Sequence, residues 1–225
     1  MQPAKLCLAA ACVLATASAR LSAQGFDGVI QFASYENHSD HPDTMTQITK
    51  GSKIRFEGMG KDGGAMIMDG TNRIILIPER KQYMNMPANV GEHAAAAEAS
   101  KHQGTAERTG KTETIAGIPC EDWHYKGTRS DGTPEEGEAC VAKGAGLMIN
   151  RLSGGMAGHV FTAGGEAFAE AIRSGAGIMK VTNNGKISLI AVNAKATSVP
   201  DAMFAPPPDY TKMDMGSMRG PPRKP

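Results

Sequence analysis

The chain is poor in aromatic residues and carries no excess of charge of either sign. Aromatic residues make up 5% of its 225 residues, and 24 basic residues are balanced by 23 acidic ones. Without a surplus of lysine and arginine there is little to neutralise a phosphate backbone, so nucleic acid is not expected as a partner. Hydrophobic residues at 40% and charged residues at 21% exclude both a disordered acidic chain and a multi-span membrane protein.

The recurring catalytic motifs are also missing. The sequence has no HExxH, no GxSxG, no P-loop and no GxGxxG that opens a helix. His38 and His41 share a polar segment that could chelate a metal, but a solvated connection explains them equally well. His124, between Trp123 and Tyr125 on an expected strand, is interpreted as a packed or rim residue rather than a base. The sequence therefore predicts a non-enzymatic protein without a cofactor.

The one long apolar run lies at the N-terminus and is short for a membrane span. Residues 1–23 contain Lys5, a charge-free run over residues 6–19, and small residues that offer cleavage after Ala19 or Ala23. These features are typical of a secretory signal peptide. Lipoprotein processing at Cys12 is disfavoured because the run before it is short. We expect a periplasmic or secreted protein, without an integral membrane span after cleavage.

Cysteine is scarce, and its placement supports export. Cys7 and Cys12 leave with the signal, so Cys120 and Cys140 remain as a single possible pair. Their spacing matches neither CxxC nor a zinc knuckle. In an oxidising compartment such a pair usually bonds, and a loop of about 20 residues closed in this way is worth roughly 3 kcal/mol. We predict a structural disulfide.

Twenty-seven glycines and many short alternating runs favour β structure. Strands are expected at residues 26–35, 44–50, 52–58, 65–68, 73–77, 82–86, 111–116, 120–126, 138–142, 147–152, 178–182 and 187–194. Short helices are expected at residues 89–102 and 165–174. The pattern predicts one mainly β domain over residues 24–208, a strongly curved antiparallel sheet or half-barrel of about ten strands with a few short helices. Residues 209–225 are expected to form a tail rich in Met, Pro and Gly, disordered beyond about Met215.

Apolar residues recur on one face of successive expected strands, and in an antiparallel meander they line up across the sheet. The few expected helices cannot cover such a stripe fully, and an uncovered stripe is unusual unless something binds it. Trp123 and Tyr125 share a face of a later strand, and their polar tips are expected near the rim. The alternative is that loops and the glycine-rich segment fill the space. The candidate ligand-binding residues are Ile30, Phe32, Ile54, Phe56, Ile75, Ile77, Trp123 and Tyr125.

Methionine is abundant, with 14 residues. Met66/Met68 and Met84/Met86 lie in expected strands, where adaptable core filling or the lining of an apolar cavity explains them. Near the C-terminus, the three thioethers of Met213, Met215 and Met218 would suffice for a trigonal Cu(I) site. This site belongs to an alternative hypothesis, a copper-handling protein.

Several segments resemble an exported bacterial family, domain-of-unknown-function family number 4412. They are GSKIRFE at 51–57, MDGTN at 68–72, GIPCEDW at 117–123 and MFAPPPDYTKMDM at 203–215. The resemblance covers most of the chain after residue 25. That family is in turn similar to the periplasmic lipoprotein carriers, which implies a strongly curved antiparallel sheet with helices at its mouth and an apolar concave face that holds acyl chains. The resemblance implies no catalytic residues.

The leading functional hypothesis is a monomeric carrier or binding protein whose apolar groove takes a lipid or amphipathic ligand. The alternatives are the copper-handling protein and an envelope structural or stress protein that uses its sheet edge for partners.

Overall fold

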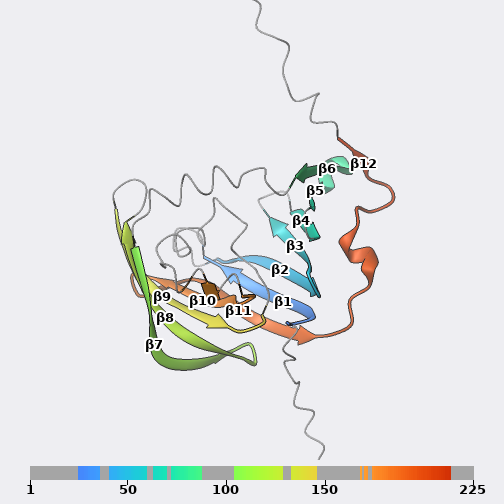
Figure 1. Ribbon diagram of the computed structural model, residues 1–225. Coiled ribbons are helices and arrows are strands. Elements are labelled where there is room, and N and C mark those ends of the chain that lie inside the picture. The colour runs from blue at the N-terminus through green and yellow to red at the C-terminus, as the bar shows by residue number, and fades with distance from the viewer. Residues whose placement is uncertain are drawn as a thin grey trace, which may run out of the picture.

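The computed structural model describes residues 25–35, 41–59, 63–69, 72–87, 104–128, 133–145, 168, 170–171 and 174–213. These residues form one open, curved sheet of twelve strands (Figure 1). The strands are β1 (Gly28–Ser34), β2 (Asp43–Lys50), β3 (Lys53–Met59), β4 (Gly64–Asp69), β5 (Asn72–Ile77), β6 (Gln82–Pro87), β7 (Gly104–Ile115), β8 (Ile118–Thr128), β9 (Pro134–Ala142), β10 (Gly177–Asn183), β11 (Lys186–Ala196) and β12 (Thr211–Lys212). The expected mainly β fold is confirmed.

The two halves of the sheet meet at β1. The spatial order is β12-β6-β5-β4-β3-β2-β1-β11-β10-β9-β8-β7, so β1 lies between its sequence neighbour β2 and the distant β11. Neighbouring strands are antiparallel except β12, which pairs parallel with β6. Figure 1 shows β7–β9 on one side and β3–β6 on the other, with the sheet bent between them. The bend gives the sheet an inner, concave face and an outer, convex face.

Each face of the sheet has its own hydrophobic core. On β4, Met66 and Met68 belong to the inner core, whereas Ala65 and Ile67 belong to the outer one, because successive side chains of a strand point to opposite faces. The inner core is the larger and extends across the sheet from β4 to β8. The continuous apolar composition of β4 therefore reflects burial on both faces.

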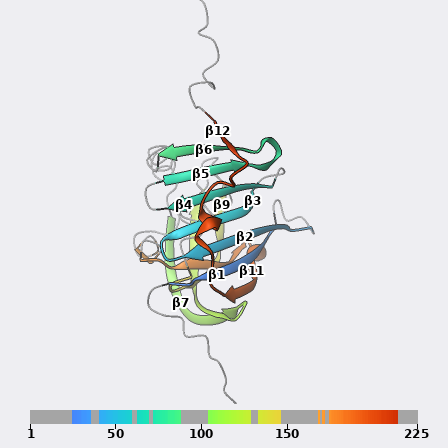
Figure 2. The ribbon, with the colours of Figure 1, turned by 90° about the vertical axis from the view of Figure 1, so that its right-hand side faces the viewer.

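The outer core is covered by the C-terminal segment, residues 197–213, which we call the strap. Figure 2 shows the strap crossing the strands and ending as β12 beside β6. Phe204, in the 3-10 turn η3 (Asp201–Phe204), is buried in the outer core with Val199. Lys50 and Lys53 both pair with Asp201, at 2.9 and 3.3 Å. These ion pairs are exposed and contribute little, so the apolar contacts hold the strap.

The strap includes the start of the expected tail. Thr211 and Lys212 form β12, and the backbone N–H of Met213 donates to the Tyr83 carbonyl at 2.7 Å. Two residues without apolar alternation give no strand signal in the sequence, so the parallel pairing was not anticipated. Residues 214–225 lie outside the described part of the chain.

Most expected strands are present, with differences at their ends. β7 begins at Gly104 rather than at residue 111, because this edge strand is largely exposed and has polar residues where a buried strand would alternate. The 3-10 turn η2 (Pro78–Arg80) connects β5 to β6. The expected helix at 89–102 and strand at 147–152 lie outside the described residues, and of the expected helix at 165–174, residues 168, 170 and 171 are helical. Within the described ranges, no helix is both long and apolar enough to cross a membrane.

Candidate functional site

The strand register aligns side chains on the inner face into two rows. Residues directly opposite on antiparallel strands share a face, with Cβ atoms about 5 Å apart. The first row runs from β1 to β6 through Ile30, Gln47, Phe56, Met66, Ile75 and Met84. The second runs from β3 to β6 through Ile54, Met68, Arg73 and Met86. The predicted alignment of Ile30, Phe56 and Ile75 is therefore present.

Burial changes along these rows. Ile30, Phe32, Ile54 and Phe56 are buried members of the inner core. At the other end, on β5 and β6, four apolar side chains are only partly buried: Ile75, Ile77, Met84 and Met86. We call these four residues the open end. The predicted stripe therefore divides into a packed part on β1–β3 and an accessible part on β5–β6.

Trp123 and Tyr125, on β8, are also packed in the inner core, and they are 2% and 0% exposed. The Trp123 ring meets the Phe168 ring edge-on, with centroids 5.3 Å apart. The Tyr125 hydroxyl, expected near the rim, instead donates to the Thr182 carbonyl at 2.9 Å and contacts the Asn183 side-chain oxygen. Phe168 comes from the 165–174 segment, so at this end of the inner face the chain itself fills the space.

Two buried polar side chains interrupt the apolar rows, and the sequence analysis did not identify either. Gln47 is fully buried, and its amide donates to the Thr49 hydroxyl at 2.9 Å and to the Ala145 carbonyl at 3.3 Å. Arg73 is buried between Met68 and Met86 in the second row. The available signal was the alternation of β5, which puts Arg73 on the same face as Ile75 and Ile77.

The predicted Cys120–Cys140 disulfide is confirmed. It joins β8 to β9, with Cα atoms 5.4 Å apart. Both cysteines are buried, so the bond offers little access to an attacking thiol. A structural role fits this burial, with a stabilisation of roughly 3 kcal/mol for a loop of this length.

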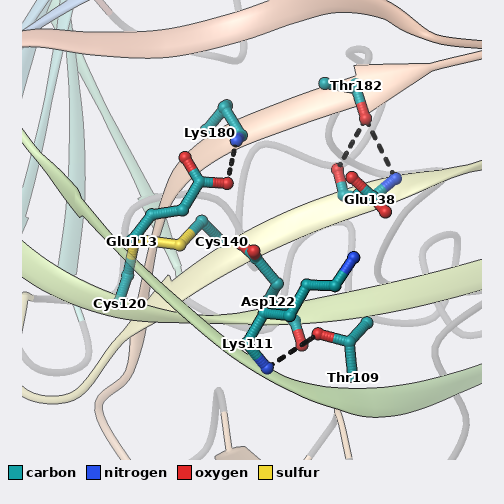
Figure 3. Close-up of polar contacts among 9 residues, drawn as sticks. All are labelled: Thr109, Lys111, Glu113, Cys120, Asp122, Glu138, Cys140, Lys180 and Thr182. Atoms are coloured by element: carbon teal, nitrogen blue, oxygen red, sulfur yellow. Dashed lines mark hydrogen bonds and ion pairs between the residues drawn. A yellow bond between two sulfur atoms is a disulfide. The ribbon is translucent and has the colours of Figure 1, made fainter.

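Two acidic residues surround this disulfide, as Figure 3 shows. Glu113 on β7 pairs with Lys180 on β10. Asp122 on β8 is buried, and its Oδ1 has no hydrogen-bond partner among the described residues. Burial is the largest cause that raises the pKa of Asp122, and repulsion from the neighbouring Glu113 carboxylate is the second. Ligand atoms of Glu113, Asp122 and Cys140 lie within 4.8 Å of one another, but the Cys140 sulfur is in the disulfide and is not a thiolate. This cluster lacks the donor set of a metal centre.

We expect Asp122→Asn to gain stability relative to the parent protein as the pH rises from about 4 to 7. A raised pKa means that folding favours the protonated carboxyl. The stability that protonated Asp122 contributes is therefore complete below the unfolded pKa of about 3.9 and is lost as the pH rises through the folded pKa. The uncharged amide has no such loss. Urea unfolding at several pH values measures the difference in free energy of unfolding.

Asp209 provides a control of opposite sign, because its hydrogen bond to Lys81 lowers the pKa of its carboxyl. A lowered pKa means that folding favours the ionised carboxylate, so this contribution is lost as the pH falls below the unfolded pKa of about 3.9. Asp209→Asn should therefore lose stability relative to the parent as the pH rises from about 2 to 5. A pH-independent difference for Asp122→Asn would contradict the raised pKa.

The copper hypothesis concerned Met213, Met215 and Met218. Met213 is partly buried beside β6, whereas Met215 and Met218 lie outside the described residues. The Cu(I) site stays a prediction.

Comparison with known proteins gives a family and a distant structural likeness. A model of the family described as a domain of unknown function, DUF4412, matches residues 26–210. No curated protein matches the chain. The solved structure of PNGF-II in the C2 space group is similar with a TM-score of 0.46 and 9% identity, over 84% of this chain and 31% of that one. The chain thus spans about a third of the length of that protein.

Proposed function

The chain belongs to the DUF4412 family, whose function is unknown, and we propose that it is an exported, monomeric, non-enzymatic protein that binds an apolar or amphipathic ligand on its inner face. The observation that carries this proposal is the open end of the apolar rows. Ile75, Ile77, Met84 and Met86 continue the buried inner core but remain partly exposed. Apolar side chains in cross-strand register offer a continuous surface to a chain-like ligand.

Methionine suits such a surface. Met84 and Met86 sit on β6, next to the short edge strand β12, and Met66 and Met68 lie two strands away on β4. Thioether side chains are unbranched and polarisable, so they adapt to ligands of different shape. The repeated Met-x-Met pattern therefore supports a surface that accepts acyl chains or similar groups without strict shape requirements.

Arg73 adds polarity to one side of this surface. Arg73 lies in the second row between Met68 and Met86, two residues along β5 from Ile75. A guanidinium group binds carboxylates and phosphates well. An amphipathic ligand with an anionic group should therefore bind more tightly than its neutral counterpart.

Export is the second part of the proposal. It is supported by the signal-like residues 1–23 and by the Cys120–Cys140 disulfide, which forms in oxidising compartments. A periplasmic or secreted location is also where a carrier of apolar molecules between envelope layers would act.

The test uses delipidated full-length protein and an environment-sensitive acyl probe. We expect saturable probe binding, displaced by a fatty acid and less readily by the fatty alcohol of equal length. Ile75→Glu should weaken probe binding at least tenfold, because it places a carboxylate in the apolar row. Asn85→Glu is the matched control, since Asn85 is exposed on β6 and pairs with Ile74, which packs against the outer core.

Absence of saturable binding, or an equal loss in both variants with folding intact by circular dichroism, would refute the binding surface. Native mass spectrometry of the purified protein distinguishes the alternatives: a retained lipid supports the proposal, whereas retained Cu(I) would favour the copper hypothesis.

A further inference from the structure

The disulfide cluster on β7–β9 contains a buried carboxylate with an unused acceptor. Asp122 is 5% exposed, and its Oδ1 has no hydrogen-bond partner among the described residues. Ligand atoms of Asp122, Glu113 and Cys140 lie within 4.8 Å of one another, and the Cys140 sulfur is bonded to that of Cys120. Figure 3 shows the two carboxylates beside the disulfide. Two carboxylates and two sulfur atoms therefore meet at one place in the fold.

The buried Asp122 oxygen lacks a compensating contact in the oxidised protein. An acceptor that is buried without a partner is costly, and native structures contain few such groups. Buried charges are tolerated where they are paired or where they coordinate a metal ion. In the oxidised protein the sulfur atoms are not thiolates, and the thiolate is the form of cysteine that binds metals. Reduction of the disulfide supplies the ligands that this cluster lacks.

We propose that reduction of the disulfide converts this cluster into a tetrahedral site for a metal ion of the zinc class. Its four ligands are Cys120, Cys140, Glu113 and Asp122. Zn²⁺ binds thiolate and carboxylate ligands in tetrahedral geometry, whereas Mg²⁺ and Ca²⁺ prefer oxygen ligands alone. Four anionic ligands around Zn²⁺ leave two negative charges, and the Lys180 ammonium group, which pairs with Glu113, offsets one of them.

The geometry requires only small movements. Zn–S bonds of about 2.3 Å in a tetrahedral site hold two sulfur atoms about 3.8 Å apart. The Cα atoms of Cys120 and Cys140 are 5.4 Å apart on the paired strands β8 and β9, so rotation of the side chains reaches this separation. The carboxylate oxygens need to approach the sulfur by no more than roughly 1.5 Å. All four ligands come from strands, which fix their positions better than loops do.

The conversion needs a dithiol reductant. The dithiol transfers two electrons and two protons to the disulfide and becomes a disulfide itself, which leaves thiols at Cys120 and Cys140. Zn²⁺ then displaces one proton from each thiol. In the reverse direction, a disulfide oxidant takes two electrons from the thiolates and two protons from solvent and becomes a dithiol. The Cys120–Cys140 bond forms again, and Zn²⁺ leaves because its sulfur ligands are lost.

The site is closed except on the side of Glu113. The Glu113 side chain is 34% exposed, whereas Lys180 is 14% exposed and both cysteines are buried. Burial slows the attack of a reductant, and it also keeps water from a bound metal ion. The cluster lies at the opposite end of the sheet from the open end on β5–β6, so it is independent of the proposed ligand binding.

The test uses full-length protein in which Cys7→Ser and Cys12→Ser remove the two other thiols. One sample is reduced with a water-soluble phosphine, and a second sample stays oxidised. Both are titrated with CoCl₂ and then with ZnCl₂. We expect the reduced protein to bind Co²⁺ with the charge-transfer absorption of a cobalt–thiolate bond, and Zn²⁺ to displace the cobalt. The oxidised protein should bind Zn²⁺ at least tenfold more weakly and show no charge-transfer absorption.

Substitution of the carboxylates tests the oxygen ligands. Glu113→Gln and Asp122→Asn should each weaken zinc binding to the reduced protein at least tenfold. Glu107→Gln is the matched control, because Glu107 is an exposed glutamate on the same strand as Glu113. Thermal melts of the oxidised proteins show that each variant folds. Because Glu113 is partly exposed, Glu113→Gln stays informative if Asp122→Asn fails to fold.

Equal zinc affinity of the reduced and oxidised proteins would overturn the proposal. So would unaltered affinity in Glu113→Gln, or an equal loss in Glu107→Gln. Zinc should also raise the melting temperature of the reduced protein and leave that of the oxidised protein unchanged. A reduced protein that zinc neither binds nor stabilises would contradict the site as well.

Discussion

Gly137→Ala is expected to lower the free energy of unfolding by about 3 kcal/mol, the upper end of the usual cost of overpacking a rigid site. An added Cβ would overlap the backbone carbonyl oxygen of Thr182 and crowd the Tyr125 hydroxyl at 2.5 Å. That carbonyl cannot retreat easily, because Thr182 belongs to the β9–β10 ladder and accepts the Tyr125 hydrogen bond. Urea denaturation followed by circular dichroism measures the loss.

Gly117→Ala is the matched control for this prediction. Gly117 has a φ of +81° and nothing within 4 Å of an added Cβ, so its substitution carries a conformational cost of about 1–2 kcal/mol without a clash. A Gly137→Ala protein as stable as Gly117→Ala would show that β9 and β10 can separate. The close approach of Tyr125 to the β9 backbone would then contribute little to stability.

Trp123→Ala is expected to cost about 4 kcal/mol, within the range for a fully buried large aromatic side chain. Its ring packs edge-on against Phe168 and lies 4.9 Å beneath the Arg108 guanidinium carbon. Ile75→Ala should cost only about 1–2 kcal/mol, because Ile75 is partly exposed and removes less apolar area from water. Circular dichroism is the readout for both variants.

The comparison of these two variants separates core from ligand surface. Trp123→Ala should mainly reduce stability, whereas Ile75→Ala should mainly reduce acyl-probe affinity. If Trp123→Ala were as stable as Ile75→Ala and lost probe binding instead, the ligand surface would extend to β8, as the sequence alone suggested.

Strands were predictable wherever local alternation reflects burial. Residues 53–58 alternate Ile54 and Phe56 with charged side chains, and β3 lies there. The expected strand at residues 111–116 is shorter than β7, because the N-terminal part of β7 is a polar edge strand, where solvent exposure removes the hydrophobic period. β12 depends on a parallel contact with β6 from a distant part of the chain, which no local pattern encodes.

The sequence predicts which face of the sheet carries the candidate site, but not how much of that face is accessible. Period-two alternation placed Ile30, Phe56 and Ile75 on one face, and the register aligns them. Which part of that face is accessible depends on what packs over it. Phe168 reaches Trp123 through tertiary contact, and sequence alternation carries no information on such covering. For Arg73, alternation likewise indicates the face of β5 on which it lies, but not that its charged side chain is buried.

The pairing of β1 with β11 has a consequence for folding kinetics. β1 is the first described strand in the chain and β11 is among the last, so the contact that joins the two halves of the sheet closes a very long loop. Contacts of high sequence separation slow folding, whereas the β2–β6 and β7–β9 meanders can form from local hairpins. Before β11 docks, the free edges of β1 and β10 are both available to pair with other chains. The slow step of folding is therefore the step that also protects the protein from aggregation.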